Sequence, residues 1–157
     1  MLSKNEKPDD VLVIDVLQRA SMLATYLFEQ YAGRELTARQ FAILHAVSQT
    51  KGGSQTALVS LTGIDRSTLS DVVERLVKRG LLRRRRDQKD TRVWVVRLTP
   101  DGEEALKRGE AVARKVEEAV LACVPAARRG QFLDALTKIG ETTIDAPSVS
   151  RRPRDIG

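Results

Sequence analysis

The stretch that decides the fold runs from Thr56 to Leu98 and reads TALVSLTGIDRSTLSDVVERLVKRGLLRRRRDQKDTRVWVVRL. It places a helix–turn–helix pattern directly before a basic β-hairpin. Between Arg75 and Arg97, ten basic residues are opposed by only two acidic ones, so this segment carries a charge of +8. The whole chain carries +6, because the seventeen basic and nineteen acidic residues elsewhere leave about −2. Surfaces that bind a polyanion concentrate positive charge in this way.

Two short helices joined by a tight corner are predicted around the start of this stretch. Ser54 is placed to cap a helix over 55–61, and Thr62-Gly63-Ile64 has the length and the glycine of a helix–turn–helix corner. Asp65 is placed to cap the next helix, which ends near Lys78. The apolar residues of that helix repeat at the spacing of a single inward face. They are Leu69, Val72, Val73, Leu76 and Val77.

A β-hairpin is predicted next, with strands over 81–86 and 92–98 joined by a polar loop. Side chains alternate between the faces of a strand, so Arg84 and Arg86 share one face of the first strand. The second strand has one drier face, and Trp94 is expected to pack beneath the hairpin.

The first helix of the chain is expected to begin after Asp9 or Asp10 and to end near Gly33. Its apolar residues cover nearly the whole circumference of the helix. A helix that is apolar all round must be buried on several sides. A single short domain struggles to provide that burial, so a second subunit is a natural source.

Three more helices complete the pattern. Thr37 and Gln40 have the spacing of a capping box at the start of the second helix. A fifth helix is expected from Thr99-Pro100 to about Val124, and a sixth from Pro125. The fifth carries a seam of small residues that admits a close neighbouring helix: Ala105, Gly109, Val112, Val116, Ala119 and Cys123. The sixth has four residues expected to face inward: Phe132, Leu133, Leu136 and Ile139.

Composition bounds the class of protein. With 41% hydrophobic and 31% charged residues, the chain of 157 residues is globular rather than disordered. Only 4% of its residues are aromatic, which disfavours stacking platforms for single-stranded nucleic acid. The lone Cys123 suits a reducing compartment, and residues 1–10 contain no apolar signal core. A cytoplasmic protein is the expectation.

The predicted helix and hairpin suit double-stranded DNA. A helix fits the major groove and reaches base edges from its N-terminal end, while a hairpin tip brings cations to the minor groove. The predicted contacts from the helix are Arg66, Ser67, Thr68, Ser70, Asp71 and Arg75. The predicted contacts from the hairpin are Arg84, Arg86, Lys89, Asp90 and Arg92. Arg66 has the donors to read guanine, Asp71 can accept from cytosine, and Asp90 is placed to orient the Arg92 guanidinium.

The run over 65–106 resembles the MarR family of bacterial transcriptional regulators. The resemblance rests on Asp90-x-Arg92 in the hairpin, on the run RLVKRGLLRR from Arg75 to Arg84, and on Leu98-Thr99-Pro100. The flanking helices match in order and length, so the resemblance extends over nearly the whole chain. It differs in the hairpin loop, where Thr91 stands in place of a second basic residue found in many members.

The resemblance implies a mainly α fold with a small β-hairpin wing, a winged helix–turn–helix of six helices. It implies one domain over 1–146 that dimerises through its N- and C-terminal helices, over 9–33 and 100–146. The DNA-binding lobe spans 36–99. The tail over 147–157 is expected to be disordered.

The resemblance also implies a homodimeric repressor that binds a pseudo-palindromic operator. Repressors of this family are released by a small ligand, often phenolic or anionic, or by oxidation of a cysteine. The family's ligand pocket lies between the first, second and fifth helices. This position makes Tyr26, Tyr31, Phe41 and His45 candidate lining residues, although a lone histidine is more often structural.

Several alternatives stay open from the sequence. The hairpin of a winged helix can also dock on an acidic protein partner, and a regulator can activate rather than repress. Cys123 either packs beside Val120 and Val124, the favoured reading, or senses oxidation. An enzyme is disfavoured because the chain lacks a nucleophile–base pair and a phosphate-cradling glycine loop. No Cys/His cluster points to a metal, and no cofactor is predicted.

Overall fold

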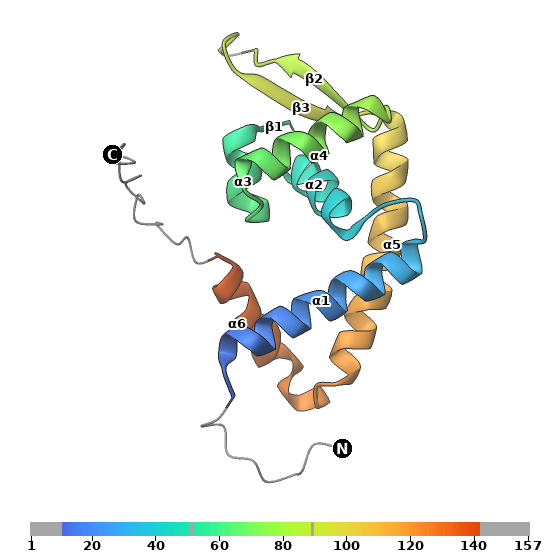
Figure 1. The fold of residues 1–157 in the computed structure, drawn as a ribbon, viewed down its shortest axis with the longest axis vertical. Helices are drawn as coiled ribbons and strands as arrows, with labels where there is room; N and C mark the ends of the chain where they lie inside the picture. The colour runs from blue at the N-terminus through green and yellow to red at the C-terminus, as the bar shows by residue number, and fades with distance from the viewer. Residues whose placement is uncertain (1–10, 51, 89, 142–157) are drawn as a thin grey trace, which may run out of the picture. The chain divides into compact units, whose positions relative to one another are not determined.

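The computed structural model describes residues 11–50, 52–88 and 90–141. This part of the chain forms six α-helices, a short 3-10 helix and one three-stranded antiparallel sheet (Figure 1). The helices are α1 (Val13–Ala32), α2 (Ala38–Gln49), α3 (Gln55–Thr62), α4 (Arg66–Lys78), α5 (Pro100–Ala122), η2 (Ala126–Arg128) and α6 (Arg129–Glu141). The strands are β1 (Gly53–Ser54), β2 (Leu82–Arg86) and β3 (Trp94–Leu98). The predicted fold class, a mainly α winged helix–turn–helix, is confirmed.

The chain divides into two compact units, with the boundary after Cys123. The first unit contains α1 to α5 and the sheet, with α5 following the end of β3 and packing across α1 (Figure 1). The second unit contains η2 and α6. None of the described helices combines the length and the apolar character that crossing a membrane requires.

The centre of the first unit's core is made of aliphatic side chains from α2, α3, α4 and β2, and residues of α1, β3 and α5 complete it. Its most completely buried members are Ile43, Leu44, Val47, Leu58, Leu69, Leu76 and Leu82. No polar or charged side chain is buried among the described residues, so the buried face of α4 packs on the lobe through apolar contacts alone. Leu69, Val73 and Leu76 are buried as the spacing predicts, while Val72 and Val77 are half-buried.

Side-chain caps begin four helices at the residues that the sequence predicts. Thr37 Oγ1 accepts the amide hydrogen of Gln40 at 3.2 Å, and the Gln40 side chain accepts back from the Thr37 amide at 3.1 Å. The other three caps are the side chains of Ser54, Asp65 and Thr99. Gly63 ends α3 with φ +65°, a left-handed conformation that glycine adopts without strain. This glycine sets the corner of the helix–turn–helix.

The sheet contains one strand more than predicted. Gly53 pairs with Val96 and Ser54 pairs with Val95, which gives the strand order β1-β3-β2. A strand of two residues is too short to show alternation, so the sequence pattern could not reveal it. Because Ser54 is also the N-cap of α3, this pairing ties the hairpin to the start of the helix–turn–helix.

The prediction that Trp94 packs beneath the hairpin is wrong. Its side chain is 52% exposed, and the Arg86 guanidinium lies over its ring at 4.1 Å from the centroid. Val95 and Val96 are the buried residues of β3. The contact between Arg86 and the indole ring is a cation–π interaction, which covers one part of an otherwise exposed aromatic side chain.

Several expectations for the flanking helices change. The first helix begins at Val13 after an uncapped Leu12, and Asp9 and Asp10 lie outside the described residues. The neighbour that the small-residue seam of α5 admits is in the same chain, since a Cβ on Gly109 would lie 2.5 Å from the Phe41 ring. Cys123 is exposed at the end of α5 rather than packed. The predicted tail over 147–157 lies outside the described residues.

The sixth helix does not bury the residues expected to face inward. Leu133, Leu136 and Ile139 are exposed and Phe132 is half-buried. The second unit offers these side chains only η2 and α6 itself, which is too little surface to form a core.

Candidate DNA interface

A cleft of about 590 Å³ lies between α4 and the wing, which we define as residues 82–98. Four of the predicted contact residues line this wing cleft: Arg66 and Ser70 from α4, Arg84 from β2, and Arg92 from the hairpin loop. Residues predicted separately on a helix and on a hairpin therefore share one surface.

Two polar residues of the wing cleft were missed by the sequence analysis. Gln55 and Thr56, in the first turn of α3, line the cleft. The Gln55 side-chain amide donates to Ser70 Oγ, and an Arg66 Nη donates to Thr56 Oγ1 at 3.3 Å. Their position in the first turn of α3, directly after the Ser54 cap, was the sequence feature that could have indicated them. The α3 helix thus orients two of the side chains through which α4 faces the cleft.

The tip of the wing is folded by Asp90 in a way that differs from the prediction. Asp90 Oδ1 accepts the backbone amide of Arg92 at 2.9 Å, and the Asp90 carbonyl accepts the amide of Val93 at 3.0 Å. The bidentate pair with the Arg92 guanidinium does not form. Asp90 holds the turn instead, which leaves the Arg92 guanidinium open to an external anion.

The remaining predicted contacts lie around the wing cleft rather than in it. Ser67 and Asp71 are exposed on the first half of α4. Thr68 is half-buried and its amide donates to Asp65 at 2.9 Å. Arg75 lines a different cleft, which α4 shares with α1 and α2.

Arg86 and Lys89 are the two remaining predicted contacts from the hairpin. Arg86 stacks on Trp94 and donates to the Thr91 carbonyl at 3.1 Å, so the wing itself engages its guanidinium. Lys89 lies outside the described residues. A DNA contact by either residue stays a prediction.

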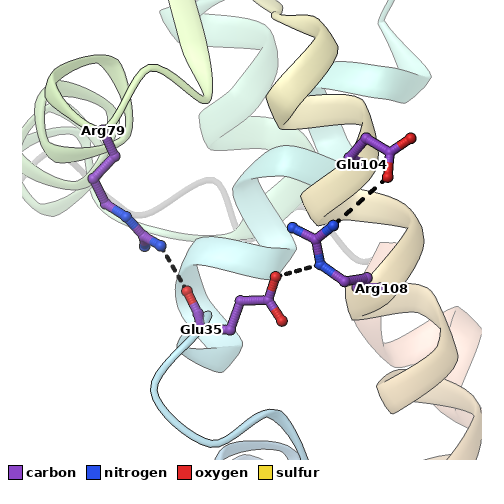
Figure 2. A network of polar contacts seen from close by, with 4 residues as sticks. All are labelled: Glu35, Arg79, Glu104 and Arg108. Carbon is purple, nitrogen blue, oxygen red and sulfur yellow. Dashed lines mark hydrogen bonds and ion pairs between the residues drawn. The ribbon is translucent and has the colours of Figure 1, made fainter.

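The C-terminal end of α4 is tied to the rest of the first unit by a polar network (Figure 2). Arg79, the C-cap residue, donates to the Glu35 carbonyl at 2.7 Å and to Gln40 Oε1 at 3.1 Å. The Glu35 carboxylate pairs with Arg108 of α5, which also lies 3.6 Å from Glu104. The network connects α4 through the segment before α2 to the long helix α5, and it makes Arg79 a positioning residue for α4.

Replacing Arg79 with alanine is expected to lower the free energy of unfolding by about 1 kcal/mol, the net value of a typical hydrogen bond. If the protein binds duplex DNA through α4, its affinity for DNA should fall while its preference among sequences is kept, because Arg79 acts on the placement of α4. Urea unfolding and fluorescence anisotropy measure the two effects. Lys78→Ala is the matched control, since it removes a neighbouring charge and breaks only the exposed pair with Glu74. Equal effects in both variants would contradict the role of Arg79.

The N-terminal end of α4 depends on the ionised form of Asp65. Hydrogen bonds from the hydroxyl and the amide of Thr68 lower the pKa of this carboxyl below its ordinary value of 3.8. A lowered pKa in the folded state means that the cap stabilises α4 fully above the unfolded pKa and loses that effect as pH falls through the folded pKa.

Asp65→Asn keeps a side-chain acceptor but removes the titration. Unfolding followed by circular dichroism should therefore show a smaller loss of stability between about pH 6 and about pH 3 in this variant than in the unmodified protein. Asp101→Asn, in the exposed first turn of α5, is the comparison. An identical pH dependence for Asp65→Asn and the unmodified protein would show that the cap does not titrate in this way.

The four residues predicted to line a ligand pocket differ in their surroundings: two are stacked rings and two are exposed tyrosines. Phe41 stacks on Phe28 and on His45, with ring centroids at 5.0 and 5.8 Å. Tyr26 and Tyr31 are exposed on α1. These tyrosines cannot enclose a ligand in one chain, so their role stays a prediction.

A helix–turn–helix whose second helix shares a cationic cleft with a β-wing defines a winged-helix DNA-binding protein. The sequence profile of the MarR family matches residues 35–93, and the chain belongs to this family of transcriptional regulators, which are not enzymes. It is 30% identical to the transcriptional regulator HosA of Escherichia coli over 122 residues, which cover 74% of this chain and 90% of HosA. It is 32% identical to the transcriptional repressor NicR of Pseudomonas putida over 125 residues, 79% of each chain.

A solved structure supports the same assignment. Bordetella bronchiseptica BpsR, whose DNA binding is regulated by 6-hydroxynicotinic acid, matches with a TM-score of 0.78 and 28% identity. The match covers 88% of this chain and all of the BpsR chain.

Proposed function

We propose that this protein is a homodimeric, cytoplasmic repressor that binds a pseudo-palindromic operator in double-stranded DNA and is released by a small phenolic or anionic effector. The observation that carries the proposal is the wing cleft, in which Arg66 and Ser70 of α4 meet Arg84 and Arg92 of the wing. Helix side chains at this position enter the major groove, while the wing follows the adjacent backbone or minor groove.

The proposed readout divides the residues by chemistry. Arg66 and Asp71 have the donors and acceptors to distinguish guanine and cytosine, while Ser67, Thr68 and Ser70 serve bases or phosphates equally. The hairpin residues Arg84, Arg86, Lys89, Asp90 and Arg92, with Arg75 of α4, supply or support the phosphate and minor-groove contacts. Because the guanidinium groups of Arg84 and Arg92 have no ion pair in the described part of the chain, binding does not have to break one.

The apolar surface of α1 supports the dimer. Large aliphatic side chains lie exposed along this helix: Val13, Ile14, Val16, Leu17, Met22 and Leu23. Contiguous exposed apolar residues mark an interaction surface. A second copy of the chain, contributing the same helix across a twofold axis, buries this surface and presents two recognition helices to the operator.

Control by a small molecule is proposed from the relatives. BpsR is regulated by 6-hydroxynicotinic acid, and NicR is named a repressor. In this chain the candidate lining residues are Tyr26, Tyr31, Phe41 and His45, which a second subunit would have to enclose. A ligand releases DNA when it favours a half-site spacing that does not match successive major grooves.

The salt dependence of duplex binding tests this function against a protein-interaction role for the wing. If Arg84 and Arg92 of two copies each neutralise a phosphate, the slope of log affinity against log salt is steeper than about −3. Fluorescence anisotropy with a labelled duplex measures it, and light scattering should give two chains of 17.4 kDa per particle. A flat salt dependence, or a strictly monomeric protein, would contradict the proposal.

A promoter–reporter assay separates repression from activation.

A further inference from the structure

The face of the wing that turns away from the wing cleft carries an unusual cross-strand pair. Arg83 of β2 lies directly opposite Arg97 of β3 in the antiparallel register, and Arg85 follows on the same side of β2. Like charges directly opposite each other destabilise a sheet. Neither Arg83 nor Arg97 has an ion pair or a hydrogen bond from its side chain to another described residue. No direct ion pair between described residues therefore offsets the repulsion between these two arginines.

Both arginines line a second cavity, the outer cleft, of about 420 Å³ between the wing and α5. Lys107 of α5 adds a third cation to its wall. The half-buried Leu98 contributes apolar surface to the same cavity, with the buried Val47 and Leu106 behind it. The outer cleft thus combines a cationic side with an apolar one.

Gly52 permits the arrangement of Arg97. A Cβ on this glycine would lie 3.0 Å from Arg97 Nε and 3.3 Å from its Cγ, so a larger residue would press on the side chain. The backbone of Gly52 also has φ +119°, which disfavours other residues. The small size and the backbone conformation of Gly52 therefore leave room for the Arg97 side chain.

Two carboxylates limit the kind of molecule that fits. Glu103 and Glu110 of α5 also line the outer cleft, and neither is in an ion pair with its cations. A long polyanion such as DNA, which would span the whole cleft, is repelled by these carboxylates more than a compact anion held between the two guanidinium groups. The combination favours a small molecule with one anionic group.

We propose that the outer cleft binds a small organic anion, whose carboxylate or phosphate lies between Arg83 and Arg97 and whose apolar body rests on Leu98. Guanidinium groups bind both kinds of anion through paired N–H donors. Lys107 adds a point charge from α5, so an occupied site links the wing to that helix. The site is separate from the wing cleft and from the residues nominated for the effector, so it does not rest on the proposed function.

Isothermal titration and thermal unfolding of the full-length protein with three probes test the site. Benzoate and phenyl phosphate carry the same ring and different anions, while benzyl alcohol is the neutral counterpart. Ionic strength is held constant with sodium chloride, because salt alone also relieves repulsion between arginines. We expect saturable binding and a raised unfolding temperature with one or both anions and neither effect with benzyl alcohol. The anion that binds identifies the group that the site prefers.

Variants connect binding to the named residues. Arg97→Gln and Arg83→Gln should each weaken binding by at least about tenfold, a loss of ~1.4 kcal/mol. Without a probe, each should unfold at a higher temperature than the unmodified protein, because the cross-strand repulsion is gone. Lys107→Gln should weaken binding, whereas Lys115→Gln, an equal charge loss farther along α5, should not.

Three results would overturn the proposal: no saturable binding of either anion, an equal response to benzyl alcohol, or unchanged titrations in all of Arg83→Gln, Arg97→Gln and Lys107→Gln. If one arginine variant does not fold, the other carries the same test. Loss of operator binding is not a readout here, so failure of this site leaves the proposed repressor function standing.

Discussion

Gly102→Ala is expected to destabilise the protein by about 3 kcal/mol, the upper part of the range for overpacking. A Cβ at this position would lie 2.0 Å from the Leu81 carbonyl oxygen and 3.0 Å from the Leu81 carbonyl carbon. Both are backbone atoms, so no side-chain rotation relieves the clash. The same Leu81 oxygen accepts the Thr99 amide at 3.1 Å, and Thr99 caps α5 through the Gly102 amide. The start of α5 and the root of the wing meet here, and one methyl group forces them apart.

Urea unfolding followed by circular dichroism measures this loss. Gly130→Ala, in α6, is the matched control, because a Cβ there meets nothing within 4 Å in the single chain. Alanine is favoured over glycine in a helix by about 1 kcal/mol, so the control should not be destabilised. An unfolding free energy for Gly102→Ala equal to that of the unmodified protein would show that α5 does not approach Leu81 this closely.

Replacing Arg66 and Arg92 together by alanine is expected to have the largest effect on DNA binding. Each direct contact is worth about 1–3 kcal/mol, so the double variant should lose ~2–6 kcal/mol of operator affinity if the two contributions add. The two residues come from different elements, α4 and the hairpin loop, and line the same cleft. Arg66→Ala alone should also reduce the difference in binding affinity between the operator and a random sequence, because it removes a base contact.

The control for this variant removes the same number of positive charges from residues that do not line the wing cleft. Arg114→Ala with Lys115→Ala takes two cations from exposed positions on α5, outside the wing cleft. Anisotropy titrations at one salt concentration compare the two pairs, since affinity for DNA depends on salt. If both double variants weaken binding equally, net charge rather than the wing cleft governs recognition.

The local signals in the sequence predicted α4 most completely. Asp65 caps it, Lys78 ends it, and Leu69, Val73 and Leu76 form its buried face. Each of these features depends on residues within one or two turns, which a single sequence displays. The wing strands were also found, with boundaries one or two residues too wide, because the ends of strands fray into turns.

The features that the sequence did not reveal depend on residues far apart in the chain. The two-residue strand β1 exists only because β3 pairs with it. Trp94 alternates like a core residue, yet it is exposed and Arg86 stacks on it from the neighbouring strand. The contacts of Gln55 and Thr56 with α4 require the corner at Gly63 to fold.

For the site, sequence reasoning placed Arg66, Ser70, Arg84 and Arg92 as candidates without showing that they share one cleft. It gave Asp90 the wrong partner atom, because the Arg92 amide and guanidinium are indistinguishable by spacing. The sequence predicted that the apolar residues of α1 and α6 are buried, but most of them are exposed in the single chain. What covers them is not contained in one chain.

Hydroxyl-radical footprinting on chromosomal fragments selected by the purified protein, in the presence of competitor DNA, tests most directly whether two copies read duplex DNA through α4 and the wing. We predict two symmetric protected half-sites about one helical turn apart, and binding at least ~1,000-fold tighter than to competitor. A protein that selects no fragment over competitor, or that protects a single site without twofold symmetry, would contradict the dimeric repressor described above.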